Sequence, residues 1–376
     1  MSYHLSRRAV LKWLETPSVY HIAKDELYEL DNESFTFLRN CLDKGGCTSK
    51  DSAFIDYCME EGLLTRERVV VRHPLLIPVP KPSLRYLELQ ITDACNLCCK
   101  HCYIDKTKHS ELSPGQIRSV LAQFEEMQGL RVMITGGEPL LHSRFGEINE
   151  MLPDIAVRKV LFTNAVLLNK EMLKSLKVDE IQVSIDGLAA SHDAIRGPGS
   201  FERTVQAVRQ AVDAGYDVSI STMVHRGNLE EFDALEDLFK GMGIKDWTVD
   251  VPCPTGRLAD NADLSVSPEE GGKYLGYGFG GGLHAAGQGF ACGLHLAAVM
   301  ADGTIAKCTF YGDQGVGSIE QGLMTAWHKM RPVRLGDLSC DCEYIEVCRG
   351  GCRYRAELSG SKGGKDLYRC NLYGIL

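Results

Sequence analysis

The stretch "RYLELQITDACNLCCKHC", residues 85–102, runs from a β-prone segment directly into a loop that carries four cysteines. Five later segments resemble its first eight residues, and amphipathic stretches separate them. This alternation predicts an α/β fold with a parallel sheet, either curled into a partial barrel or left open. In both cases the functional site should lie at the carboxyl ends of the strands. The strands are predicted at 85–92, 131–137, 159–164, 180–186, 218–224 and 247–252.

The first helical segment has clear start signals and one apolar face. Ser113 is a predicted N-cap, and Pro114 takes the first helical position. Similar patterns at 200–215 and 228–243 each end at a glycine that can adopt the left-handed C-cap conformation. The apolar face of the first helix consists of Ile117, Val120, Leu121, Phe124 and Met127.

The regions on either side of this repeat read differently. Residues 19–30 predict a β-hairpin, two short helical patterns follow it, and the proline-rich segment 71–84 predicts a linker. Past Pro254 the sequence becomes glycine-rich, then cysteine-rich, with little periodicity. We therefore predict three domains: a small N-terminal module at 1–80, the strand-helix repeat at 81–285, and an irregular domain at 286–376.

Composition disfavours several classes of function. The chain has 376 residues and a net charge of −9, which disfavours nucleic acid as the main partner. No apolar run reaches the roughly 18 residues that a membrane span needs, and the N-terminus lacks an apolar signal core. We therefore expect a cytoplasmic protein without a membrane partner. In that compartment its 15 cysteines are expected to be metal ligands or redox groups.

Three cysteines of the opening loop have the spacing of an iron-sulfur site. Cys95, Cys99 and Cys102 stand as C-x3-C-x2-C immediately after a predicted strand. Three thiolates on one loop can bind three irons of a [4Fe-4S] cluster and leave the fourth open for another ligand. A zinc knuckle that also uses Cys98 is the alternative, but two adjacent cysteines give poor tetrahedral geometry. Cys98 is accordingly predicted to be a spare thiol.

This loop resembles the motif of the radical S-adenosylmethionine (SAM) enzymes, with His101 beside its last cysteine. The resemblance implies a partial (β/α)6 barrel in which the open iron binds SAM and reductive cleavage yields a 5′-deoxyadenosyl radical. It also implies that His101 packs beside the adenine. The segment 135–141, "TGGEPLL", resembles a second family motif, in which Gly136, Gly137 and Glu138 meet the SAM amino group.

Four further residues match family positions that contact SAM. Asn164 lies in "FTNA", where Ala165 replaces the usual glycine, and Ser184 and Asp186 lie in "SIDG". By resemblance Ser184 and Asp186 contact the ribose, and Arg196 pairs with the SAM carboxylate. The alternative is structural: Asn164 and Asp186 cap turns, and Arg196 is a solvated surface charge.

The cysteine-rich tail is compatible with zinc or with iron-sulfur clusters. It resembles the SPASM extension of radical SAM enzymes, which implies two auxiliary [4Fe-4S] clusters. Two alternatives stay open. Cys253 is a candidate fourth ligand of the first cluster. Asp341 is an alternative oxygen ligand, because Cys340 and Cys342 have the spacing C-x-C where the family usually has C-x2-C. The implied ligands are Cys292, Cys308 and Cys352 for the first cluster and Cys340, Cys342, Cys348 and Cys370 for the second.

The order of elements in the N-terminal module resembles a PqqD-like, winged-helix peptide-recognition element. The resemblance implies that a precursor peptide adds a strand to the hairpin edge. The alternative is a small packing domain that braces the barrel.

The hypothesis that follows is an oxidoreductase, a SAM-cleaving maturase of a precursor peptide, served by an electron donor such as flavodoxin or ferredoxin. Among its products a thioether crosslink is favoured, because an open iron on the first auxiliary cluster could hold substrate sulfur. Alternatives are a sulfatase-maturing type of enzyme, a haem or quinone biosynthesis enzyme, and a non-catalytic iron-sulfur electron carrier. No catalytic residue is identified, and the candidate bases Asp250 and His225 read equally well as structural polar groups.

Overall fold

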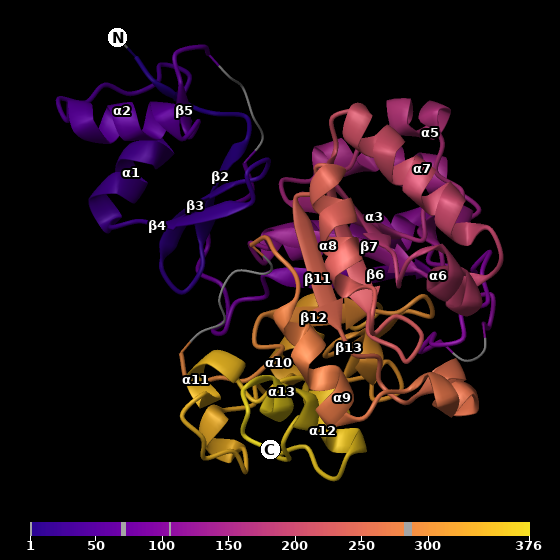
Figure 1. Cartoon of the computed structure of the whole chain (residues 1–376). Coiled ribbons are helices and arrows are strands. Elements are labelled where there is room, and N and C mark those ends of the chain that lie inside the picture. Colours follow the sequence, from indigo (N-terminus) through magenta and orange to yellow (C-terminus); the bar gives the residue numbers. More distant parts are fainter. Residues whose placement is uncertain (1, 69–72, 105–106, 282–287) are drawn as a thin grey trace.

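The computed structural model describes residues 2–68, 73–104, 107–281 and 288–376, and a nine-stranded sheet organises its main body (Figure 1). Along the sheet the strands follow the order β11-β10-β9-β8-β7-β6-β12-β13-β14. The six strands from β6 to β11 pair in parallel and follow the chain order, which confirms the predicted α/β repeat and the partial barrel. Their bounds are β6 Tyr86–Thr92, β7 Arg131–Gly136, β8 Arg158–Thr163, β9 Glu180–Ser184, β10 Asp217–Met223 and β11 Asp246–Asp250.

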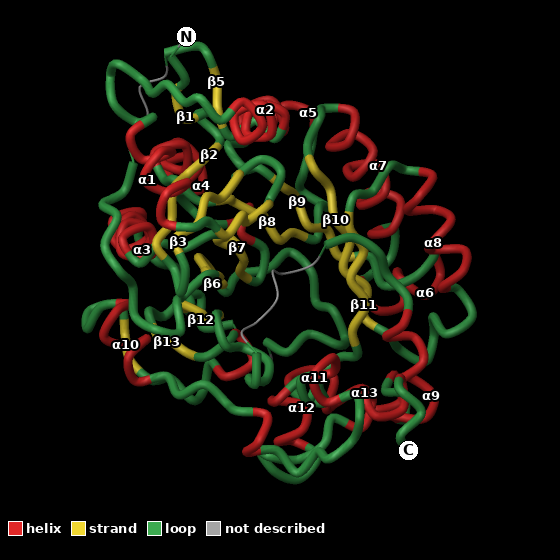
Figure 2. The backbone as a smooth tube through the Cα atoms, turned by 90° about the vertical axis from the view of Figure 1, so that its left-hand side faces the viewer, coloured by secondary structure: helices red, strands yellow, loops and turns green. Residues whose placement is uncertain are grey.

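Helices cover the outer face of this curved sheet, as Figure 2 shows for α3, α7 and α8. In β6 the side chains alternate, so that Leu87, Leu89 and Ile91 join the core beneath the helices while Tyr86 and Glu88 face the interior of the barrel. The helices of this part are α3 Pro114–Glu126, α4 Phe145–Met151, α5 Lys170–Ser175, α6 Ala189–Arg196, α7 Ser200–Asp213 and α8 Phe232–Gly241.

The predicted start of α3 is confirmed in detail. The Ser113 side chain accepts the Gln116 N–H, and the Gln116 side chain in turn accepts the Ser113 N–H, which forms a capping box. Pro114 follows at the first helical position. All five apolar residues predicted for its face are buried. The predicted glycines after α7 and α8 are also confirmed, since Gly215 and Gly243 have φ values of +85° and +73°.

The tail adds strands that the sequence did not predict. Strand β12 (Leu296–Val299) pairs in parallel with β6, and β13 (Thr304–Ala306) and β14 (Gly317–Ser318) continue the sheet antiparallel. The sheet of the barrel therefore continues into the cysteine-rich region. The predicted domain boundary at 285/286 lies outside the described residues. The helices after β11 are α9 Pro268–Gly271, which precedes the tail, and then α10 Leu323–Lys329, α11 Ile345–Cys348, α12 Arg353–Leu358 and α13 Leu367–Leu372.

The N-terminal module has a three-stranded antiparallel sheet in the order β2-β3-β4. Strands β3 (Pro17–His21) and β4 (Glu26–Glu29) form the predicted hairpin, and β2 (Ala9–Trp13) is a third strand that was not predicted. The rest of the module consists of α1 Asn32–Asn40, α2 Ser52–Glu60 and the short pair β1 His4–Leu5 and β5 Leu64–Thr65.

Buried polar contacts fix this module to the barrel. Lys12 Nζ donates to Gly129 O at 2.7 Å and to Ala156 O at 3.2 Å, and Arg158 Nη1 donates to Ile22 O at 2.9 Å. Arg158 begins β8, and Gly129 precedes β7, so these contacts lie at the amino ends of the strands. In the part of the chain that the structure describes, no helix is both long and apolar enough to cross a membrane.

Candidate active site

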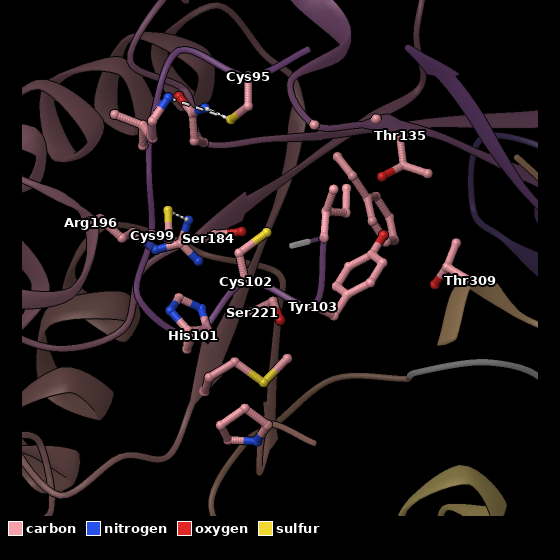
Figure 3. Close-up of a pocket in the computed structure, with 18 of the residues that line it drawn as sticks. Cys95, Cys99, His101, Cys102, Tyr103, Thr135, Ser184, Arg196, Ser221 and Thr309 are labelled. Atoms are coloured by element: carbon pink, nitrogen blue, oxygen red, sulfur yellow. Dashed lines mark hydrogen bonds between the residues drawn. The ribbon is translucent and has the colours of Figure 1, made fainter. Parts of the chain in front are cut away.

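A pocket of about 320 Å³ opens at the carboxyl ends of the parallel strands (Figure 3). Loop 93–104, which follows β6, supplies one side of it. The ends of β7 to β10, the segment after β11 and part of the tail supply other parts of the lining. This is the location that the strand pattern predicts. The sequence-predicted residues on its lining are Cys95, Cys99, His101, Cys102, Gly136, Gly137, Asn164, Ser184, Asp186 and Arg196.

The cysteine loop presents three of its four thiols to this pocket. Cys95, Cys99 and Cys102 line it, whereas Cys98 is exposed and is not among the lining residues. Asn164 supports the loop, because its Nδ2 donates to Asn96 Oδ1 at 2.8 Å and lies 4.0 Å from Cys95 Sγ. Three thiols on a single loop thus converge on one cavity, as the ligands of a three-cysteine cluster must.

A buried charge network lies beside the cysteines. Asp186 is fully buried, and its carboxylate accepts from Arg196 Nε at 2.6 Å and from Met223 N at 2.9 Å. Although burial opposes its charge, Arg196 and then His101 hold the pKa of Asp186 well below its usual range. Arg196 Nη1 lies 3.9 Å from Cys99 Sγ, so the arginine joins the network to the cysteine loop. Arg196 is therefore not a solvated surface charge.

His101 is held as a neutral ring. Burial lowers its pKa to about 4, although the Asp186 carboxylate raises it. Its Nε2 lies 3.3 Å from Asp186 Oδ2, while Nδ1 is buried and has no hydrogen-bond partner in the described structure. Since the Nε2 proton is directed at the carboxylate, Nδ1 is left as a buried acceptor. Such a group is costly unless a ligand supplies a donor.

The Glu138 carboxylate already has hydrogen-bond partners within the protein. Its side chain is fully buried and is absent from the pocket lining, and its carboxylate accepts from Thr163 Oγ1 at 2.8 Å and from Asn164 N at 2.8 Å. Burial nevertheless raises the pKa of Glu138 to about 7. The carboxylate therefore ties the turn after β7 to the end of β8. It accepts the Asn164 N–H and so helps to fix the position of Asn164.

The two glycines of this turn are required by the backbone that packs against them. A Cβ on Gly136 would lie 2.6 Å from Thr92 O, and one on Gly137 would lie 2.4 Å from Ala94 O. Both glycines therefore let the turn approach the start of the cysteine loop closely. At the next strand end, Ala165 has φ +60°, so the alanine adopts the left-handed conformation for which the family uses glycine.

Several lining residues were not predicted from the sequence. Glu88 projects from β6, and its Oε2 accepts the backbone N–H of Thr309, which belongs to the tail. Tyr103 packs against Phe310 with ring centroids 5.3 Å apart. In Figure 3 Tyr103 and Thr309 lie across the pocket from Arg196. Glu88 could have been predicted as a pocket residue, because it is a charged residue within an otherwise apolar strand. No feature of the sequence places Thr309 or Phe310 in the lining.

Four tail cysteines surround a second, much smaller pocket. Cys340, Cys342, Cys348 and Cys370 all line it, which is the set that the resemblance implies for the second auxiliary cluster. Both cysteines of the C-x-C segment take part, so the short spacing does not separate them. Asp341, the alternative oxygen ligand, is exposed and is not part of this lining.

The remaining tail cysteines form another group together with Cys253. The thiols of Cys253 and Cys352 interact directly, which lowers the pKa of Cys352 to about 6 and raises that of Cys253. Cys292 interacts electrostatically with both Cys308 and Cys352. We call Cys253, Cys292, Cys308 and Cys352 the first tail group. It offers four thiols rather than three.

The two candidate bases are satisfied structural groups. Asp250 Oδ1 accepts from Arg355 Nη1 at 2.8 Å. His225 Nε2 lies 2.8 Å from Asp186 O, and its Nδ1 accepts the Gly227 N–H at 3.1 Å. Neither residue lines the pocket. Arg355 also binds Asp366, so it connects the end of β11 to the tail.

The residues at the pocket fit an iron-sulfur cluster with bound SAM. Three thiols line one cavity, and beside them lie the unpartnered Nδ1 of His101 and the paired charges of Asp186 and Arg196. Within the described ranges, no three His, Cys, Asp or Glu side chains converge as the ligands of a single metal ion would. The loop cysteines and the second set of tail cysteines are each grouped by a cavity that they line.

The Radical SAM superfamily model matches residues 89–239, which span β6 to α8. Residues 89–239 are a radical SAM domain. Its first matched strand leads into the cysteine loop, and the pocket described above lies within it and at its border with the tail.

Curated relatives of the radical SAM domain carry two kinds of name. The AdoMet-dependent heme synthase of Nitratidesulfovibrio vulgaris is 32% identical over 50% of this chain and 54% of its own length. The mycofactocin maturase MftC of Mycolicibacterium smegmatis is 28% identical over 71% of this chain and 77% of its own. The chain spans about half the length of the heme synthases that it matches.

Among solved structures, Streptococcus suis SuiB bound to precursor peptide SuiA superposes with a TM-score of 0.64 at 16% identity. That match covers 98% of this chain and 100% of SuiB, so the likeness of fold includes the N-terminal module and the tail as well as the radical SAM domain. A second neighbour, anSMEcpe with bound AdoMet and the Cp18Cys peptide, has a TM-score of 0.58 and covers 77% of this chain.

Proposed function

We propose that this protein is a radical SAM enzyme that oxidatively modifies a precursor peptide. The observation that carries the proposal is the convergence of Cys95, Cys99 and Cys102 on one pocket at the carboxyl end of a radical SAM barrel. When bound there, a [4Fe-4S] cluster and SAM would supply a 5′-deoxyadenosyl radical that abstracts a hydrogen atom. We place the enzyme in the cytoplasm, where its thiols stay reduced.

The chain's own residues would bind and orient the cofactors. Cys95, Cys99 and Cys102 would hold three irons, and Asn164 would hold the cysteine loop in place through Asn96. His101 would accept a hydrogen bond from SAM at its buried Nδ1, since Asp186 fixes the ring from the other side. Gly136, Gly137, Ser184, Asp186 and Arg196 complete the proposed SAM site, and Glu138 acts through Asn164.

The interior of the pocket offers a few polar groups to a substrate within a mainly apolar lining. Glu88, Gln182 and Ser221 line it from three strands, where barrel interiors are usually filled by branched apolar side chains. Tyr103 and Phe310 close the side next to the tail with aromatic surface. We propose that a peptide segment enters between these two sides and that Glu88 accepts an N–H from it.

The two tail groups are proposed to hold the auxiliary [4Fe-4S] clusters that accept the electron released during oxidation. The second group would use Cys340, Cys342, Cys348 and Cys370, and the first group would use Cys292, Cys308, Cys352 and Cys253. With Cys253 as a fourth ligand, no iron of the first cluster is reserved for a substrate sulfur. An open iron would then no longer favour a thioether over other crosslinks. The proposed product is a crosslink, and a thioether remains one of its forms.

The N-terminal module is proposed to bind the leader of the precursor peptide, as a PqqD-like element would. Strand β4 is an edge of the three-stranded sheet, and Glu26 and Glu29 at its ends are exposed. An extended peptide can add to such an edge through main-chain hydrogen bonds. The domain division at 1–80, 81–285 and 286–376 belongs to this proposal.

A second candidate function is a tetrapyrrole-processing enzyme. It is favoured by the 32% identity to the N. vulgaris heme synthase, although that match covers only 54% of the synthase. It would leave the module without a peptide to bind. A sulfatase-maturing activity is a further variant, since anSMEcpe shares the fold.

The experiment starts with anaerobic reconstitution and measurement of bound iron and sulfide. Dithionite and SAM are then added, and 5′-deoxyadenosine is quantified. Co-expression with candidate precursor peptides, followed by mass spectrometry, detects the loss of two hydrogen atoms that a crosslink causes. The triple variant C95A/C99A/C102A serves as control.

Formation of 5′-deoxyadenosine by the wild type but not by the triple variant supports the proposal. A protein with a full complement of iron that forms no 5′-deoxyadenosine overturns it and favours the electron carrier. SAM cleavage with conversion of a porphyrin, but of no peptide, favours the second candidate.

A further inference from the structure

A cleft of about 290 Å³ adjoins the first tail group, and its charged lining is entirely basic. Lys81, Lys307, Arg331 and Arg334 line it together with His328, and no carboxylate belongs to its described lining. The chain as a whole carries a net charge of −9, so this surface departs from its average. We call it the basic cleft.

The cations of the basic cleft are available to a partner. The side chains of Lys81, Arg331 and Arg334 are exposed, and within the described ranges none of them forms an ion pair. The nearby Asp337 accepts the backbone N–H of Arg334 at 3.3 Å. Unpaired surface cations of one sign create a local positive potential that attracts an acidic surface.

The basic cleft is also preformed. Ala291 N donates to Val333 O and Leu335 N to Gly289 O, each at 2.9 Å, so two strand-like segments hold its sides together. Trp327 Nε1 donates to Pro82 O at 2.8 Å, which fixes the linker that carries Lys81. Phe290 contributes half-buried aromatic surface to the lining. Aromatic and arginine side chains are typical of protein interfaces.

The basic cleft adjoins the first tail group along the chain. Gly293 and Lys307, which line the cleft, directly adjoin Cys292 and Cys308 in the sequence. Lys307 packs against Gly293, where a Cβ would lie 3.0 Å from its Cε, and its charge interacts with both cysteines. On its other side the first tail group reaches the active-site pocket, because Cys253 lines that pocket.

We propose that the basic cleft docks an acidic one-electron carrier protein of the flavodoxin or ferredoxin class. This inference rests on the proposed function, which requires electrons to be supplied to the enzyme. Charge complementarity favours an acidic protein, and the position next to four cysteines favours a redox partner over the peptide substrate. Docking there would place the carrier beside the first tail group, one member of which, Cys253, lines the SAM pocket. The reduced carrier would give one electron, by way of a cluster in this group, for the reductive cleavage of one SAM. The cluster, oxidised again, could then take the electron released when the substrate radical is oxidised.

The test compares two triple charge reversals of the reconstituted holoenzyme. K81E/R331E/R334E alters the basic cleft, while K170E/K177E/R209E makes the same change of charge at exposed residues around α5 and α7. Formation of 5′-deoxyadenosine is followed with a reduced acidic flavodoxin and, separately, with dithionite. Binding of the oxidised flavodoxin is measured by calorimetry at about 50 mM and about 500 mM salt.

The cleft variant should need about tenfold more flavodoxin for half-maximal rate at low salt, because steering and complementarity are lost. Its rate with dithionite should stay within about twofold of the wild type, and the control variant should resemble the wild type in both assays. Wild-type binding should weaken as salt rises, whereas the cleft variant should bind weakly at both salt concentrations.

Three outcomes would overturn docking at this site. The first is an equal loss of the flavodoxin-dependent rate in the cleft variant and the control variant. The others are wild-type binding of flavodoxin that does not change with salt concentration, and binding by the cleft variant that equals that of the wild type. If an acidic peptide competes for the cleft and flavodoxin does not bind, the partner is a peptide and the proposal is wrong. A wild type that forms no 5′-deoxyadenosine with dithionite refutes the proposed function instead, and calorimetry still decides the docking site.

Discussion

Replacing Cys99 by alanine should remove one whole iron-sulfur cluster, whereas the same replacement at its neighbour Cys98 should remove none. Cys99 is 8% exposed and lines the active-site pocket together with Cys95 and Cys102. Cys98 is exposed to solvent and is absent from that lining. The two variants differ by one position in the chain, so each is a matched control for the other.

The magnitude follows from the three cysteine groups. If each holds a [4Fe-4S] cluster, the reconstituted wild type contains about twelve iron atoms per chain. C98A should keep about twelve, and C99A should keep about eight because the two tail groups remain intact. C99A should also lose all reductive cleavage of SAM. The fold itself should survive, since replacing one small buried side chain costs about 1 kcal/mol.

Iron and acid-labile sulfide assays give the stoichiometry, and electron paramagnetic resonance of the reduced proteins shows which cluster is missing. Circular dichroism checks that C99A is folded. A C99A protein that keeps about twelve irons and cleaves SAM would refute the ligand assignment. So would a folded C98A protein that loses about four irons, since that result would make Cys98 a ligand.

Four further changes test other parts of the structure. C253A should lose or loosen up to about four irons of the first tail group, and unchanged iron content with an unaltered spectrum would count against ligation by Cys253. The E88A variant should cleave SAM at a rate within about twofold of the wild-type rate, but mass spectrometry should show peptide modification at least about tenfold slower. An unchanged rate of peptide modification would show that Glu88 makes no contact with the substrate. The R355M variant should have a free energy of unfolding about 3–5 kcal/mol lower than the wild type, because it leaves the buried Asp366 without its ion-pair partner. A denaturation midpoint equal to that of the wild type would contradict this prediction. Acidification should destabilise the apoprotein. Burial lowers the pKa of His101 from 6.5 to about 4, so between these pH values the unfolded chain binds a proton that the folded chain excludes. The free energy of unfolding should therefore fall by on the order of 3 kcal/mol as the pH falls through that window. H101N should make this part of the stability profile less steep in chemical denaturation. Some slope should remain, because burial also lowers the pKa values of His192 and His73 to about 4. An unchanged profile would show that His101 titrates normally.

The parts of the fold that depend on local patterns were predictable. All six parallel strands, the capped start of α3 and the glycine ends of α7 and α8 follow from spacing and end signals within short segments. The cysteine loop was predictable for the same reason, because its three ligands lie within eight residues. The contact between Cys253 and Cys352 joins positions about a hundred residues apart, and no local pattern encodes it.

Strand pairing by the tail shows where such reasoning stops. Strand β12 is short, and no hairpin turn in the sequence connects it to one of the predicted strands. Its partner β6 lies about two hundred residues earlier in the chain. The partner of Glu138 was missed for a related reason. The motif marks its carboxylate as important, but only the three-dimensional path of the turn shows that it bonds to Thr163 and Asn164 rather than facing the pocket.

The position of the N-terminal module constrains how a precursor peptide could use it. Lys12 and Arg158 fix the module at the amino ends of the barrel strands, and the pocket lies at their carboxyl ends. A strand of six residues, such as β7, is about 20 Å long at about 3.3 Å per residue. A peptide held on β4 must therefore pass the whole height of the sheet before it reaches the pocket. The modified residue should accordingly lie at least about six extended residues from the held segment, and a module that only braced the barrel would impose no such minimum.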